Sequence, residues 1–439
     1  MLVNKTLANS CFALLSLGAI AISGISLPQA ARASEQPSLD GLVRQAASKD
    51  QATSQQAIAK LREFKNVGID AFWNAYQKDL PNNSQLRATL DAICQQKDCD
   101  ASRLYWYKDL EAAKTASKES GKPILSLRLL GNLNDELSCA NSRFFRTALY
   151  PNAGVSQLLR DRFILHWQPE RPVPKVTIDF GDGRKLEQTL TGNSIHYVLD
   201  SDGRPIDAIP GLYSPQAFMD NLKDADGAAQ LLDNTNDLKL RREVLVKYHR
   251  DRLAKLEKNW RSDLTRLRLP AQPLLQTVAI APTNIDATIA SRLAVGKMAI
   301  ELPTLTRTPS VPLSEVIPPS PFAKLSDANW ARLARLYQNR VYLDQGSLKL
   351  MERKLSPSAS MPTVVNSFER AIAQDTVRNE YVFHAQIHSW FANGEFMNSD
   401  ASLTALNRRV YDQLFLTPAS DPWLGLVNVN VYTGISKVN

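Results

Sequence analysis

Several residue types and motifs are scarce in this sequence, and each scarcity excludes a class of protein. Only four cysteines occur in 439 residues, so the fold does not depend on a framework of disulfides. The 18 glycines are too few for a collagen-like repeat. The chain has no Gly-rich phosphate loop, no Gly-x-Ser-x-Gly elbow and no His-Glu-x-x-His motif, which removes three common enzyme signatures. Apolar residues, in contrast, make up 44% of the chain and can form a large core.

Residues 1–33 have the pattern of a secretory signal peptide. Lys5 precedes an uncharged run from Cys11 to Leu27, and Ala31-Arg32-Ala33 gives the small-x-small pattern that signal peptidase cleaves. We therefore expect export to the periplasm or an equivalent extracytoplasmic compartment, with no transmembrane helix after cleavage. Because the run of 17 residues is close to the minimum for crossing about 30 Å of hydrocarbon, a retained amino-terminal anchor is the alternative.

Positive charge is concentrated in one segment of the chain. Residues 237–268 contain 11 Lys and Arg against 5 Asp and Glu, in a chain whose net charge is +8. Four apolar residues recur there every seven positions: Val246, Leu253, Trp260 and Leu267. This spacing predicts a long basic amphipathic helix over 235–268. A solvated helix with i,i+4 ion pairs is the simplest interpretation, and contact with an anionic surface or acidic partner is the alternative. Nucleic acid is not an expected partner in an exported protein.

The rest of the chain separates into regions of different pattern. Residues 34–104 have helical spacing, whereas residues 105–224 alternate helices with short apolar strands. A connector over 269–324 is rich in proline, with one helix expected at 285–300. Residues 325–439 are helical again, and Asn366 with Glu369 suggests a capping box at the start of a helix from 367 to 391. We predict an α/β domain flanked by mainly α-helical amino- and carboxy-terminal regions.

Three cysteines follow the signal peptide. Cys94 and Cys99 are separated by four residues, and an oxidising compartment favours a disulfide between them. A zinc site is disfavoured, because neither histidine nor further cysteine is nearby. Cys139 is then the odd thiol. It follows the apolar strand at Ile124–Leu130 and begins a helix, where unpaired N–H groups and the helix dipole favour a thiolate.

In this arrangement residues 105–224 resemble the thioredoxin-like superfamily, whose redox Cys-x-x-Cys motif stands at the same strand-to-helix junction. Trp106, Gly121-Lys122-Pro123, the Tyr197–Gly203 segment and Gly211 carry the rest of the resemblance. The segments 138–146 and 421–426 also resemble a poorly characterised group of exported bacterial envelope proteins, which brings no defined reaction. The resemblance implies a thioredoxin-like α/β domain.

Two positions depart from the thioredoxin pattern. Ser142 stands where the resolving cysteine would be, so release of a mixed disulfide formed at Cys139 needs an outside thiol. Ser194 occupies the place of the family's cis-proline. His196, on the strand near this junction, is a candidate to assist ionisation of Cys139. The resemblance thus implies monothiol exchange with a thiol substrate, as an oxidoreductase or isomerase. The alternative is a non-catalytic binding or scaffold protein with a protein partner, in which Cys139 is inert.

The remaining candidate site is a pair of histidines. Glu380, His384 and His388 lie four residues apart, so one helix face presents all three side chains. His384 and His388 could clamp a metal ion, whereas Glu380 lies about 12 Å along the helix axis from His388 and is hard to include. Because Ile387 and Phe391 share this face, buried core histidines are the competing interpretation. No cofactor is predicted from any motif.

Overall fold

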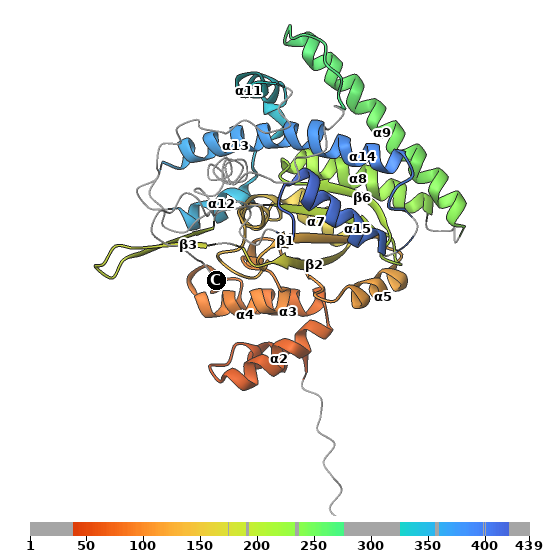
Figure 1. The fold of residues 1–439 in the computed structure, drawn as a ribbon. Helices are drawn as coiled ribbons and strands as arrows, with labels where there is room; N and C mark the ends of the chain where they lie inside the picture. Colours follow the sequence, from red (N-terminus) through yellow and green to blue (C-terminus); the bar gives the residue numbers. More distant parts are fainter. Residues whose placement is uncertain are drawn as a thin grey trace, which may run out of the picture. The chain divides into compact units, whose positions relative to one another are not determined.

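The computed structural model describes residues 38–173, 175–189, 193–232, 237–275, 325–355, 360–397, 399 and 401–420 (Figure 1). The signal peptide, nearly all of the proline-rich connector with its expected helix, and the segment after 420 lie outside these residues. Among the described residues, no helix is both long and apolar enough to cross a membrane. The described chain is mixed α/β, with helices at both ends.

The amino-terminal region is helical and has a small core of its own. Its helices are α1 (Leu39–Ala46), α2 (Gln51–Glu63), α3 (Asn66–Tyr76) and α4 (Ser84–Cys94), with short 3-10 turns η1 (Leu80–Asn82) and η2 (Cys99–Ala101). Asp50 and Asn83 cap α2 and α4 by accepting backbone N–H bonds. Leu61, Phe72 and Leu90 are fully buried in this core.

A four-stranded mixed sheet forms the centre of the α/β region. Its strands are β1 (Ile124–Leu130), β2 (Ile164–Arg171), β5 (Ser194–Leu199) and β6 (Pro205–Pro210), in the order β2-β1-β5-β6. β1 pairs with β2 in parallel and with β5 antiparallel, and β5 pairs antiparallel with β6. β1, β5 and β6 are buried on both faces, which explains their nearly continuous apolar sequences. β3 (Lys175–Asp179) and β4 (Lys185–Thr189) form a separate antiparallel hairpin, and Gly181-Asp182-Gly183 lies in the turn between them.

Helices cover this sheet. They are α5 (Leu110–Ser120), α6 (Ala140–Phe144), the π-helical turn η3 (Phe145–Leu149), α7 (Ala153–Arg162) and α8 (Pro215–Leu232). The side chain of Asp109 caps the start of α5, and Gly121, with φ of 69°, ends the helix. α5 contacts β1 and β2, whereas α8 contacts β5 and β6.

The predicted basic helix is α9 (Leu238–Arg266), 29 residues long. It packs against α8 and α14, and its fully buried positions include Leu245, His249, Leu256 and Trp260. The apolar residues that recur every seven positions predicted the buried face of α9 only approximately, because two of them, Val246 and Leu253, are half-buried. Exposed cations occur along the rest of the helix, namely Lys239, Arg242, Lys247, Arg250, Lys255, Lys258 and Arg261.

The carboxy-terminal helices share one core with the sheet. They are α11 (Asp327–Arg335), η5 (Gln338–Arg340), α12 (Gln345–Lys354), α13 (Met361–Arg378), the π-helical turn η6 (Asn379–His384), α14 (Ala385–Ala392), α15 (Ala401–Arg409) and the π-helical turn η7 (Val410–Leu414). The expected capping box is wrong: Pro362 stands in the first turn of α13, so Asn366 lies inside that helix. Glu369 instead accepts the N–H of Leu343 at 2.9 Å. In Figure 1, α8, α9 and α14 gather beside β6, where the candidate site lies.

Candidate functional site

Cys139 stands at the predicted strand-to-helix junction but is fully buried. It is the residue before α6, and its Sγ lies 3.3 Å from Oγ of Ser194, the first residue of β5. Ser142 is turned to its own helix, with Oγ 2.6 Å from Ser138 Oγ and 2.8 Å from the carbonyl oxygen of Cys139. No described peptide bond is cis, so the bond before Ser194 is trans. The thiol therefore packs inside the α/β core.

His196 is paired with a tyrosine. Its Nε2 lies 2.7 Å from the hydroxyl oxygen of Tyr150, and its ring packs between Phe145 and Phe218. Burial lowers the pKa of His196 to about 3. A histidine with so low a pKa is a weak proton acceptor, and on β5 the contact with Cys139 belongs to Ser194 instead.

Cys94 and Cys99 form a disulfide between the end of α4 and η2, and both are fully buried. The carboxylate of Asp91 accepts the N–H of Cys99 at 2.9 Å. The next acidic residue, Asp98, pairs with Arg146 and with Lys354, each at 2.9 Å. These contacts tie the small disulfide loop to η3 and α12, which is a structural role.

The predicted histidine pair belongs to a larger buried cluster. His384, at the end of η6, and His388, on α14, stack with ring centroids 4.1 Å apart. His384 Nε2 lies 3.3 Å from Oδ1 of Asp207 on β6, and His384 Nδ1 lies 3.1 Å from Oε2 of Glu380. His388 Nδ1 lies 2.8 Å from Nδ1 of His249 on α9. Four separate elements thus bring three histidines and two carboxylates together.

Hydrogen-bond geometry assigns the protons on two of these rings. His249 Nε2 lies 2.9 Å from the carbonyl oxygen of Ile206, so this nitrogen carries the proton and donates it. In the neutral ring, Nδ1 of His249 is then an acceptor, and Nδ1 of His388 must donate to it. Nε2 of His388 is left with a lone pair. It is buried and has no hydrogen-bond partner among the described residues.

The two carboxylates place the positive charge of the cluster on His384. Although burial opposes protonation, Glu380 and Asp207 raise the pKa of His384 to about 9. Burial likewise opposes ionisation of Glu380, but His384 and Arg252 lower the pKa of this carboxyl to about 2. Burial lowers the pKa of His249 to about 4, and burial with the charge of His384 lowers that of His388. The ligand-free cluster therefore holds one imidazolium between two carboxylates.

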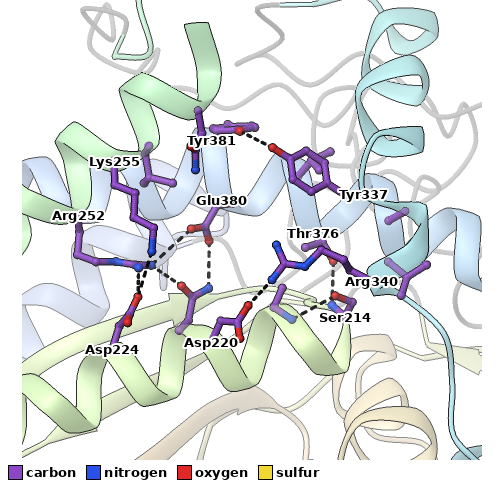
Figure 2. A pocket seen from close by; sticks show the side chains of 17 residues that line it. Ser214, Asp220, Asp224, Arg252, Lys255, Tyr337, Arg340, Thr376, Glu380 and Tyr381 are labelled. Carbon is purple, nitrogen blue, oxygen red and sulfur yellow. Dashed lines mark hydrogen bonds and ion pairs between the residues drawn. The ribbon is translucent and has the colours of Figure 1, made fainter. Parts of the chain in front are cut away.

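A pocket of about 130 Å³ adjoins this cluster (Figure 2). Glu380 belongs to both, because its carboxylate bonds His384 and also lines the pocket. Side chains from α8, α9, η5, α13 and η6, together with Tyr337 just before η5, form the walls. They include Asp220, Asn221, Asp224, Arg252, Lys255, Arg340, Thr376 and Tyr381. Asn221 donates to Glu380 Oε2 at 3.1 Å, which holds the shared carboxylate at the boundary.

Sequence reasoning missed Asp207 and His249. Asp207 interrupts the apolar strand Pro205–Pro210, and an acidic residue inside such a strand is a signal of a buried, paired charge. His249 lies four residues after Leu245 and seven before Leu256 on the buried face of α9, so a correctly phased stripe would have included it.

Comparison of the chain with known proteins does not indicate a family or a function. No family model, no curated protein and no solved structure matches the chain.

Proposed function

We propose that this protein is a binding protein of the cell envelope, in which a degenerate thioredoxin-like domain is a platform and the helices beside it carry the ligand site. The observation that carries the proposal is the burial of Cys139, which has no exposed surface. Thiol exchange needs a thiolate that another sulfur can approach in line. A thiol packed against Ser194 in the core offers no such approach.

The order of the elements supports the thioredoxin-like part of the proposal. The parallel strands β1 and β2 are joined through helices, and the antiparallel strands β5 and β6 lead into α8. Cys139 lies between β1 and α6, and Ser194 lies beside it at the start of β5. With serine at 142 and at 194, this platform keeps the family's layout without its redox chemistry.

The pocket between α8, α9 and α13 supports the binding part of the proposal. Its cations are matched by carboxylates in the same pocket: Arg252 pairs with Asp224 and Glu380, Lys255 with Asp224, and Arg340 with Asp220. A ligand therefore meets no uncompensated charge. A volume of about 130 Å³ is close to the roughly 150 Å³ cavity that is known to accept benzene. We infer a small, neutral, polar ligand about the size of one ring.

Two measurements test this proposal. The first is the rate of alkylation of Cys139 under native conditions. We expect this rate to equal the rate expected from global unfolding, because the buried thiol is reached only in the unfolded chain. The second is native mass spectrometry of the protein purified from its own envelope, where we expect a bound small molecule. Ala217→Leu narrows the pocket and should remove the added mass, whereas the exposed Ala254→Leu on α9 should keep it.

Monothiol exchange at Cys139 is the competing hypothesis, and the same experiments separate the two. Fast alkylation of the folded protein, with an apparent pKa well below the free-thiol value of about 8.5, would support exchange and overturn the binding proposal. If no bound molecule is found in the unmodified protein or in the variants, the pocket does not support the proposal of small-molecule binding.

A further inference from the structure

We propose that Asp207, His384 and His388 form a site for a divalent transition metal ion of the zinc class. One ligand atom from each residue lies within 4.8 Å of the other two, and all three residues are buried. This inference is independent of the small-molecule proposal, because it concerns the cluster behind Glu380 and not the pocket.

The spacing of the ligand atoms fits such an ion. Bonds of about 2.0 to 2.2 Å at tetrahedral angles place neighbouring ligand atoms about 3.3 Å apart. Nε2 of His384 and Oδ1 of Asp207 are 3.3 Å apart without any movement. The i,i+4 spacing of His384 and His388 presents the second imidazole from the same helical face.

The donor set selects the class of ion. Two imidazoles with one carboxylate suit zinc and its neighbours, whereas calcium and magnesium require mainly oxygen ligands. Three protein ligands leave one tetrahedral position for water or another ligand. The ion would replace the proton that His384 Nε2 otherwise shares with Asp207, and that proton leaves to solvent.

Each ligand is already oriented by a further group, as metal ligands in proteins usually are. His384 donates through Nδ1 to Glu380 at 3.1 Å, which leaves its Nε2 for the ion. Nδ1 of His388 lies 2.8 Å from Nδ1 of His249 and 3.9 Å from Oδ1 of Asp207, so ligation through Nδ1 would replace its hydrogen bond to His249. Nε2 of His388 is buried and has no partner among the described residues. The other oxygen of Asp207, Oδ2, accepts the hydroxyl of Tyr248 at 2.6 Å. The unpartnered nitrogen of His388 is the observation that a solely structural cluster leaves unexplained.

The test is metal binding by the full chain without an affinity tag. After chelator treatment and dialysis, we expect one Zn(II) per chain by elemental analysis, a rise in melting temperature with Zn(II) but not with Mg(II), and a tetrahedral Co(II) absorption spectrum. His388→Gln and Asp207→Asn should abolish stoichiometric binding. Glu380→Gln, which keeps all three ligands, should weaken zinc binding about 10- to 100-fold.

His166→Gln is the matched control, because it removes a buried histidine whose Nδ1 lies 2.8 Å from Ser126 Oγ, away from the cluster. It should bind zinc as the unmodified protein does. Circular dichroism identifies variants that fail to fold. If the ligand variants do not fold, the Co(II) spectrum of Glu380→Gln, which keeps all three ligands, is the measurement that tests metal binding. A folded, unmodified protein that takes up no zinc and gives only the octahedral Co(II) spectrum would overturn the proposal, and so would equal binding by His166→Gln and His388→Gln.

Discussion

Sγ of Cys139 and Oγ of Ser194 lie 3.3 Å apart inside the core, where β1 leads into α6 and β5 begins. A thiol is a weak hydrogen-bonding group, so this contact contributes little and the packing of Cys139 contributes more. We expect Ser194→Ala to change the free energy of unfolding by less than about 1 kcal/mol and Cys139→Ala to lower it by about 1 to 2 kcal/mol. Urea unfolding measures both changes. If Ser194→Ala instead alters alkylation of Cys139 in the folded protein, Ser194 tunes a reactive thiol.

Asp98 connects the disulfide loop to two helices through buried charges. Its carboxylate lies 2.9 Å from both Arg146 and Lys354, whose side chains are almost fully buried. Asp98→Asn removes the carboxylate that pairs with Arg146 and one of the two that pair with Lys354, which keeps Glu136 at 3.2 Å. We expect a loss of about 3 kcal/mol in the free energy of unfolding. Asparagine also tolerates the left-handed backbone of this position, where φ is 59°, so backbone strain is not the cause. The exposed Asp161→Asn is the control and should change stability by less than about 0.5 kcal/mol.

Local signals in the sequence were sufficient for some elements and not for others. α5 was predictable because its cap, Asp109, and its terminating Gly121 are both local. The start of α13 was not, because Asn366 and Glu369 resemble a capping box while Glu369 bonds the distant Leu343. Tertiary packing decides such cases, and no local pattern reports it.

Some residues of the candidate site could also be predicted from local signals, and others could not. His384 and His388 were found because a helix places residues four apart on one face. Asp207 and His249 reach the cluster from β6 and α9, separated from their partners by 177 and 139 residues. Only the fold brings these elements together. The pocket was not predicted either, because its residues come from two distant parts of the chain, α8 with α9 and η5 with α13 and η6.

The disulfide between Cys94 and Cys99 closes a very short loop, which limits its effect on stability. Cross-linking a loop of this size removes chain entropy worth about 2 kcal/mol at 25 °C in the loop-entropy description. We therefore expect the double variant Cys94→Ala, Cys99→Ala to fold and to lose about 2 kcal/mol in urea unfolding. Adding a reductant should destabilise the unmodified protein by a similar amount and leave the double variant unchanged. A reductant effect on the double variant would mean that Cys139 also takes part in a disulfide.

Asp91 should make stability fall as the pH rises from about 4 to above 6. Burial, together with the negative charge of Asp98, raises the pKa of Asp91 to about 6, against the opposing effects of Cys99 N–H and Lys97. Between its ordinary pKa of 3.8 and this value, the folded state binds more protons than the unfolded state. Ionisation of Asp91 therefore costs stability, on the order of 3 kcal/mol once the pH exceeds 6.

Asp91→Asn removes this ionisation and keeps an oxygen that accepts the N–H of Cys99. Relative to the unmodified protein, the variant should become more stable with each step from pH 4 to 7, most steeply between pH 4 and 6. Urea unfolding at pH 4, 5, 6 and 7 measures this difference, with the exposed Asp161→Asn as the matched control substitution. Buried titrating groups far from Asp91 are common to both proteins and their contributions cancel in the comparison, whereas Asp98 and Lys97 are coupled to Asp91. A constant difference across this range would mean that Asp91 ionises in the folded protein as it does in the unfolded chain, with Lys97 and the N–H of Cys99 offsetting its burial.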